Sequence, residues 1–160
     1  MGLPNRPSLL RDASRVQVTL GALVRSVQAR ERARAGRYDL SAGQAIALLT
    51  LSREGPLSVT NLGQHLYLEK STASRLAKSL LKLGLARKRP SSSDDRKVIL
   101  QVTEGGMRLS RRILNDLNEE YLDLLGSLEL PVRKALPAML ESLVQKLGSG
   151  PKPMDIQDSE

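Results

Sequence analysis

Residues 69–103 read EKSTASRLAKSLLKLGLARKRPSSSDDRKVILQVT, and the pattern of this segment changes once, at Gly84. Before Gly84, apolar residues recur every three or four positions, which predicts a helix over residues 69–83. The face expected to be buried consists of Ala73, Leu76, Ala77, Leu80 and Leu81. The opposite face carries Ser71, Arg75, Lys78 and Lys82, with Thr72, Ser74 and Ser79 beside them. The helix therefore packs on one side and offers small polar and basic side chains on the other.

After Gly84 the period becomes two, which predicts short strands at 85–89 and 98–103. Residues 90–95 have turn composition, so the two strands are expected to form a hairpin with an exposed polar tip. Basic residues flank this tip on both sides: Arg87, Lys88, Arg89, Arg96 and Lys97. A hairpin tip is narrow enough to enter the minor groove of DNA, whose negative potential attracts arginine. Asp94 is expected to pair with Arg96 and hold its side chain extended.

Two shorter helices are expected before this segment. Ser41 and Gln44 form a capping box that opens a helix ending at residues 54–56. Ser58 is expected to cap the next helix, in which Gly63 costs about 1 kcal/mol relative to alanine. A short helix joined by a tight turn to the helix at 69–83 is a helix-turn-helix arrangement.

Helices are also expected at both ends of the chain. An apolar stripe marks a long first helix that ends near Gly36: Leu9, Ala13, Val16, Leu20, Leu23 and Val27. Thr103 is expected to cap a fifth helix, and a sixth follows Pro131 with Leu136, Leu140, Leu143 and Leu147 on one face. Pro137 is expected to kink this sixth helix or delay its start. From residue 148 the composition is that of a disordered tail.

Composition narrows the classes of function. The 160 residues include no cysteine and a single histidine, His65, so we expect no disulfide, no thiol chemistry and no metal site or cofactor. No paired carboxylates or other catalytic group of side chains is evident, which argues against an enzyme. Charged residues interrupt every apolar run, and no signal peptide is visible, so we expect a cytoplasmic protein that does not enter a membrane.

The net charge of +8 favours a polyanionic partner. The charge gathers in two blocks, residues 1–37 and residues 70–97, and the second has nine basic side chains against Asp94 and Asp95. The aromatic residues are only three tyrosines, which makes single-strand binding by base stacking a poor fit. Duplex DNA is the partner that suits both the charge and the polar helix face.

Candidate DNA contacts follow from side-chain chemistry. The guanidinium fork of Arg75 matches the O6 and N7 atoms of guanine, whereas lysines suit phosphates. The helix at 69–83 is the predicted recognition helix, and its candidate contacts are Lys70, Ser71, Thr72, Ser74, Arg75 and Lys78. The predicted hairpin forms the wing beside this helix, and its candidate contacts are Arg87, Arg89, Asp94, Arg96 and Lys97.

Several motifs resemble the MarR family of winged-helix regulators. They are Leu40-Ser41-x-x-Gln44, Gly55-Pro56-Leu57-Ser58-Val59, Ser71-Thr72-x-Ser74-Arg75-Leu76, Gly84-Leu85, Asp94-x-Arg96 and Leu100-x-Val102-Thr103-x-x-Gly106. The resemblance implies a mostly α fold with a small β-hairpin wing, in which the helix at 69–83 enters the major groove and the hairpin at 86–103 reaches the minor groove. It also implies an obligate homodimer.

The resemblance divides the chain into four parts. Residues 38–104 would form the winged helix-turn-helix lobe, while residues 1–37 and 105–148 would interleave with a second copy as a dimerisation domain. Residues 149–160 would be the tail. Two-fold symmetry predicts a pseudo-palindromic site with half-sites about one helical turn apart.

The resemblance also implies a response to ligands, and the chain is expected to be a sequence-specific, homodimeric repressor whose DNA affinity a small molecule changes. Family members that sense oxidants use cysteine, and those that sense zinc use several histidines and acids, so neither response suits this chain. A small-molecule effector of unknown identity remains, and no motif marks its binding residues. Two other functions stay open: a basic protein that binds nucleic acid without regard to sequence, and a winged-helix module that docks on a protein.

Overall fold

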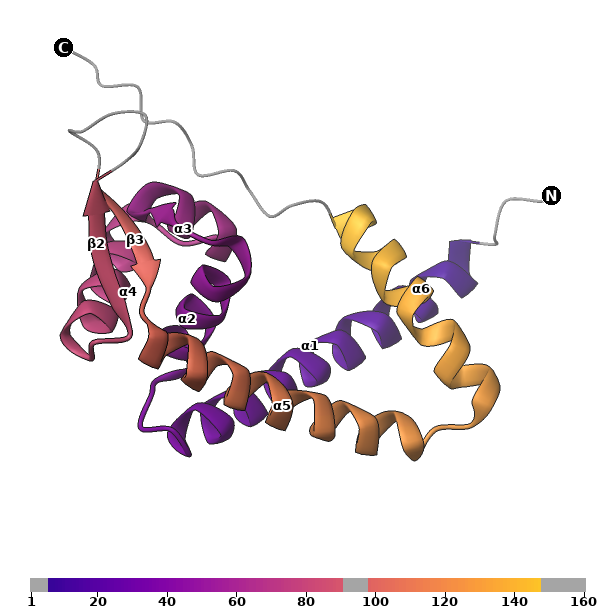
Figure 1. Ribbon diagram of the computed structural model, residues 1–160. Helices are drawn as coiled ribbons and strands as arrows, with labels where there is room; N and C mark the ends of the chain where they lie inside the picture. The colour runs from indigo at the N-terminus through magenta and orange to yellow at the C-terminus, as the bar shows by residue number, and fades with distance from the viewer. Residues whose placement is uncertain (1–5, 91–97, 148–160) are drawn as a thin grey trace, which may run out of the picture. The chain divides into compact units, whose positions relative to one another are not determined.

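The computed structural model describes residues 6–90 and 98–147, which contain six helices and three strands (Figure 1). The helices are α1 (Arg6–Gly36), α2 (Ala42–Glu54), α3 (Val59–Leu66), α4 (Lys70–Lys82), α5 (Glu104–Gly126) and α6 (Leu130–Leu147). The strands are β1 (Leu57–Ser58), β2 (Ala86–Pro90) and β3 (Val98–Val102). The chain divides into two compact units, residues 1–42 and residues 43–160. The mostly helical class with a small β-hairpin is confirmed.

The core of the second unit is aliphatic, and both helices and strands contribute side chains to it. The side chains with 2% exposure or less include Leu48, Leu51, Leu62, Leu80, Leu100 and Ile113. They come from α2, α3, α4, β3 and α5, so these elements share one core. Full burial of such a side chain contributes roughly 1.5–3 kcal/mol. This shared core fixes α4 against the rest of the lobe.

The sheet has the order β1-β3-β2, and both pairings are antiparallel. The β2–β3 hairpin confirms the two predicted strands, with β2 displaced by one residue so that Ala86 pairs with Val102 and Pro90 with Val98. Strand β1 was not predicted. Its two residues are too few to show a period, and it is held by pairing Leu57 with Leu100 and Ser58 with Ile99. The predicted two-stranded hairpin is therefore part of a three-stranded sheet.

Local side chains set the ends of the helices as predicted. The hydroxyl oxygen of Ser58 accepts a hydrogen bond from the backbone nitrogen of Asn61 (3.0 Å), which caps α3. Thr103 caps α5 in the same way, accepting from the backbone nitrogen of Gly106 (3.0 Å). At the end of α4, Gly84 has a φ of +69°, a conformation that favours glycine over any residue with a side chain.

Helix α6 corrects one prediction. It begins at Leu130, before Pro131, and it continues through Pro137. A proline in the first turn has a φ already suited to a helix, and its missing N–H would have no partner there, so Pro131 favours this early start. Pro137 lies further in, where it donates no hydrogen bond to the carbonyl of Arg133, and the helix bears that cost. The start of α6 is therefore not delayed.

Both terminal regions expose large apolar side chains. In α1 these include Leu9, Val16, Leu23 and Val27, which belong to the predicted stripe. In α6 they include Leu140, Leu143 and Leu147, and no residue of this helix is buried. Across residues 6–90 and 98–147, no helix combines the length and the apolar character needed to cross a membrane.

Candidate nucleic-acid interface

Helices α3 and α4 approach each other closely because residue 63 is a glycine. A Cβ atom at Gly63 would lie 3.0 Å from the carbonyl oxygen of Leu68 and 3.2 Å from the Cβ of Ala73. Both distances are tighter than ordinary van der Waals contact, so a side chain here would push α4 away from α3. The helix-propensity cost of Gly63 is thus offset by the packing that it allows.

The turn between the two helices is short and fully hydrogen-bonded at its start. Tyr67 ends α3 in the left-handed conformation (φ 53°, ψ 42°), and its backbone nitrogen donates to the carbonyls of Gln64 and Gly63. The nitrogen of Leu68 also donates to the carbonyl of Gly63, at 2.9 Å. Residues 67–69 therefore lead directly into α4, and the predicted helix-turn-helix is present.

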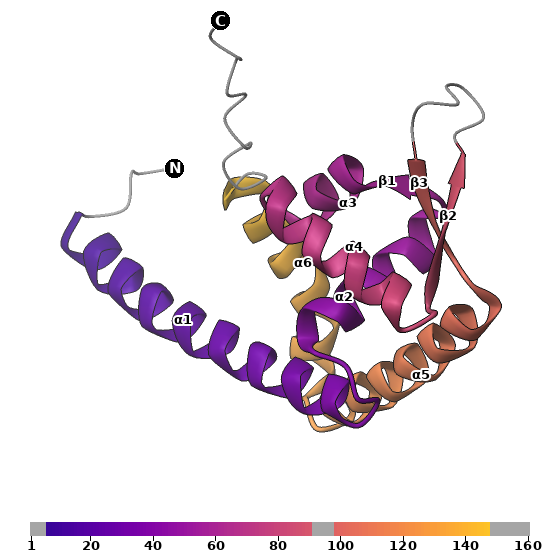
Figure 2. The same ribbon diagram turned by 90° about the vertical axis from the view of Figure 1, so that its left-hand side faces the viewer.

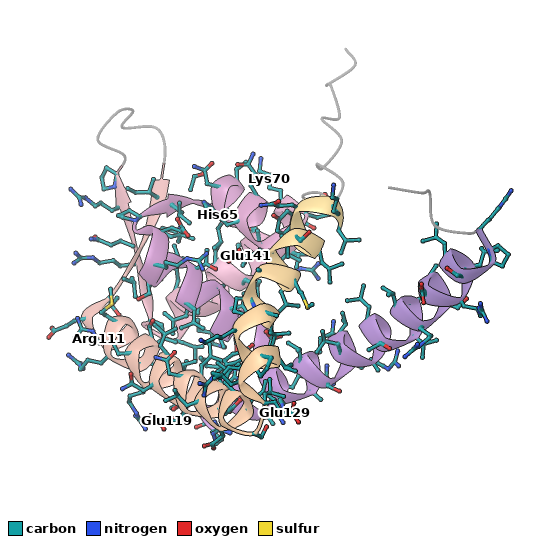
Figure 3. All side chains as sticks on the ribbon, turned by 90° about the vertical axis from the view of Figure 1, so that its right-hand side faces the viewer. His65, Lys70, Arg111, Glu119, Glu129 and Glu141 are labelled. Carbon is teal, nitrogen blue, oxygen red and sulfur yellow. The ribbon has the colours of Figure 1, made fainter. Side chains whose placement is uncertain are left out.

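Helix α4 has the two faces that its sequence predicts. Ala73, Ala77 and Leu80 are buried, and Leu76 and Leu81 are half-buried. On the other side, the exposed residues are Lys70, Ser71, Arg75, Lys78 and Lys82, and Thr72 and Ser74 are half-buried at the margin. In Figure 3, Lys70 near the top of the view lies well apart from Arg111 of α5 at the lower left. All six residues predicted for the recognition helix thus have at least part of their side chains open to solvent.

Two of these residues also contact each other. An Nη2 nitrogen of Arg75 donates to the hydroxyl oxygen of Thr72 at 3.4 Å, near the limit for a hydrogen bond. Thr72 lies one turn before Arg75, so the contact inclines the guanidinium toward the start of α4. A guanidinium has five N–H donors, so the donors of Arg75 that do not face Thr72 remain available to a ligand.

The hairpin pairs β2 with β3 (Figure 2). Arg87 and Arg89 of β2 are exposed and two positions apart, so they lie on the same face of the strand. Arg87 is anchored there: its Nε and Nη2 atoms both donate to the side-chain oxygen of Gln101, at 3.2 and 3.0 Å. Gln101 is the residue opposite Arg87 on β3. Sequence reasoning missed Gln101, because its place opposite Arg87 depends on the strand register, which the sequence leaves open.

Asp94, Arg96 and Lys97 were predicted to form the tip of the wing, and they lie outside the described residues. The described part of the hairpin ends at Pro90 on one side and resumes at Val98 on the other, where these two residues pair.

The hairpin and α5 are joined to the end of α4 by one threonine. The hydroxyl of Thr103 donates to the carbonyl of Gly84 (2.7 Å), while its oxygen accepts from the nitrogen of Gly106. The backbone nitrogen of Thr103 donates to the carbonyl of Leu85 (3.0 Å). Gly106 lies so close to Leu85 that a Cβ atom would overlap the carbonyl oxygen of that residue. The cap at Thr103 was predicted, whereas its bond to Gly84 was not.

Known proteins share both the sequence pattern and this arrangement. A profile of the MarR family matches residues 38–97, a range that includes α2, β1, α3, α4 and β2 and ends just before β3. The organic hydroperoxide resistance transcriptional regulator of Bacillus subtilis (strain 168) is 30% identical over 113 residues, covering 69% of this chain and 76% of that protein.

Solved structures agree in fold. A MarR family protein from Bacillus stearothermophilus superposes with a TM-score of 0.77 at 22% identity, over 86% of this chain and 96% of that one. A MarR transcriptional regulator from Methanosarcina mazei Go1 gives 0.72 at 22% identity, over 83% and 96%. Overoxidized AbfR bound to DNA gives 0.64 at 20% identity, over 89% and 98%. From its sequence relative and its winged helix-turn-helix fold together, we conclude that the chain belongs to the MarR family of transcriptional regulators.

Proposed function

We propose that this protein is a homodimeric repressor that binds a pseudo-palindromic site in double-stranded DNA and is released by a small molecule. The observation that carries the proposal is the exposed face of α4, where basic and small polar side chains oppose a buried apolar face. An α-helix of this kind fits the major groove, and side chains near its start can reach base edges.

Each candidate residue has a proposed role. Arg75 reads guanine, Ser71, Thr72 and Ser74 contact base edges or nearby phosphates, and Lys70 and Lys78 contact phosphates. Arg87 and Arg89 hold the hairpin on the DNA backbone, and the wing tip with Asp94, Arg96 and Lys97 enters the minor groove. Residues 38–104 form this DNA-binding lobe.

The exposed apolar side chains support the homodimer. Stripes of leucine and valine on α1 and α6 would cost free energy if they faced water in the working protein. We propose that residues 1–37 and 105–148 cover these stripes by packing against a second copy. Two-fold symmetry then presents two α4 helices to successive turns of the duplex.

Selection of binding sites from random duplex DNA tests the proposal. The purified protein is expected to retain a pseudo-palindrome with half-sites about 10 base pairs apart, at about 150 mM salt, where non-specific binding is weak. Tight retention that depends on salt but yields no common sequence would instead establish a sequence-indifferent nucleic-acid-binding protein. No retention by any duplex would favour a module that docks on a protein.

Arg75→Ala is expected to lower affinity for the selected site by about 1–3 kcal/mol and to relax the choice of base at one position of each half-site. The reason is the loss of a two-pronged contact to guanine. Titration of duplexes with each base at each position measures both effects. Arg111→Ala is the matched control, since Arg111 is an exposed arginine on α5 that lies well apart from Lys70 of α4 (Figure 3). A uniform loss across all duplexes would make Arg75 a phosphate contact.

Gln101→Leu is expected to weaken binding by about 0.5–1.5 kcal/mol, because Arg87 loses its anchor and must be ordered when DNA binds. A double-mutant cycle with Arg87→Ala checks the mechanism. If Gln101 acts through Arg87, Gln101→Leu has no further effect on affinity once Arg87 is alanine. An equal loss in both backgrounds would show that Gln101 acts independently of Arg87.

A further inference from the structure

Glu69 is the single acidic residue between Gly55 and Ser93, a segment in which seven lysines and arginines follow it. It stands at the N-cap of α4, and its side chain is exposed. A negative charge at this place repels phosphates, so it lowers the general affinity of the lobe for DNA. A carboxylate at this place is thus unfavourable for general affinity, but it can accept hydrogen bonds that a lysine or arginine cannot.

Capping α4 is not that role. Helices α3 and α5 begin with hydroxyl residues, Ser58 and Thr103, whose oxygens accept from backbone nitrogens of the first turn. The carboxylate of Glu69 makes no such hydrogen bond. Aspartate or serine at an N-cap would contribute about 1 kcal/mol in this way. What Glu69 adds to the stability of α4 is limited to its attraction to the positive end of the helix.

The chemistry of the major groove offers a use for this carboxylate. A carboxylate only accepts hydrogen bonds, and the donors exposed on base edges in the major groove are the amino groups of cytosine and adenine. Glutamate and aspartate pair with the N4 amino group of cytosine, whereas adenine suits asparagine and glutamine, which can donate as well as accept. An exposed glutamate at the start of a recognition helix is thus chemically matched to cytosine.

The surroundings of Glu69 fit this contact. Its backbone carbonyl accepts from the nitrogens of Thr72 and Ala73, both at 3.0 Å, so the residue is fixed to the first turn of α4. The short turn after Tyr67 and the close approach at Gly63 fix that turn against α3. Lys70 follows directly, and its charge offsets the repulsion between Glu69 and nearby phosphates.

We propose that Glu69 determines sequence specificity by accepting a hydrogen bond from the N4 amino group of a cytosine at one position of each half-site. This inference rests on the proposed DNA-binding function. Together with Arg75 it gives α4 two readers of opposite charge, one for cytosine and one for guanine. The half-site is therefore expected to contain at least one G·C pair.

The test compares wild type, Glu69→Ala and Glu69→Gln on duplexes that carry each of the four bases at every position of the selected half-site. Wild type is expected to prefer cytosine at one position by about tenfold. Glu69→Ala is expected to lose that preference while binding the other duplexes at least as tightly, since a charge that repels phosphates is gone. Glu69→Gln is expected to shift the preference toward adenine. Glu104→Ala, which removes a carboxylate from the first turn of α5, is expected to leave base preference unchanged.

Two outcomes would overturn the inference, and they are distinguishable. If Glu69→Ala raises affinity for every duplex by the same factor, Glu69 acts only as a charge near the phosphates. In that case the wild-type motif stands and the DNA-binding function with it. If wild type itself selects no motif, both the function and the reading of cytosine fail together. Unfolding curves of the variants at equal protein concentration exclude loss of folding as the cause.

Discussion

Gly106→Ala is expected to lower the free energy of unfolding by about 3 kcal/mol or more. The added Cβ would overlap the carbonyl oxygen of Leu85 and lie 2.8 Å from a methyl group of Val102. The Leu85 carbonyl is not free to retreat, because it accepts the hydrogen bond from the nitrogen of Thr103. The clash is therefore with constrained backbone, and relief requires α5 to move away from the base of the hairpin.

The neighbouring glycine provides a matched control. A Cβ at Gly105 would come no closer than 3.8 Å to the hydroxyl of Thr103, an ordinary contact. Gly105→Ala is therefore expected to stabilise the protein by about 0.5–1 kcal/mol, since alanine is the better helix former. Urea unfolding of both variants at one protein concentration measures the difference. Equal effects of the two substitutions on the free energy of unfolding would show that the close packing at Gly106 does not contribute to stability.

Leu140→Glu is expected to raise the dissociation constant of the dimer by about a hundredfold or more and to abolish tight operator binding. Leu140 is exposed on α6 in line with Leu136, Leu143 and Leu147, the stripe proposed to pack against a second copy. A two-fold interface would receive the substitution twice, and each buried carboxylate without a partner costs several kcal/mol. Operator affinity falls with it, because a single lobe makes only half of the contacts.

Gln145→Glu separates this effect from a change of charge. Gln145 lies half a turn away from the stripe on α6, and the substitution adds the same negative charge. The control variant is expected to remain a dimer by sedimentation and to bind the operator like wild type. If the Leu140→Glu variant remained a dimer and bound the operator with normal affinity, α6 would not be part of the dimer interface.

Much of the site could be predicted because it depends on local periodicity. The alternation of Ala73, Ala77 and Leu80 with Ser71 and Arg75 fixes which side of α4 faces the core, whatever the tertiary details. The caps at Ser58 and Thr103 follow equally from neighbouring residues, since a cap contacts nitrogens only three positions away.

The contacts that could not be predicted join residues distant in sequence. The hydrogen bonds between Arg87 and Gln101 depend on the strand register, which a turn of uncertain length leaves open. Strand β1 exists only because β3 offers it a partner. The glycines at 63 and 106 are visible in the sequence, but what they make room for is a neighbouring backbone that only the folded chain brings near.

The double role of Thr103 makes the junction between α4 and α5 a pivot. One hydroxyl bonds both Gly84, two residues after the end of α4, and Gly106 in the first turn of α5, so it ties the two helix ends to each other. Helix α5 has 23 residues and is about 34 Å long, so it acts as a lever on that pivot. A sideways displacement of about 3 Å applied at the far end of α5 tilts the helix by about 5°. The same displacement applied at its middle tilts the helix by about 10°. Any displacement of α5 relative to the lobe therefore reaches the end of α4 most strongly when it is applied close to Thr103.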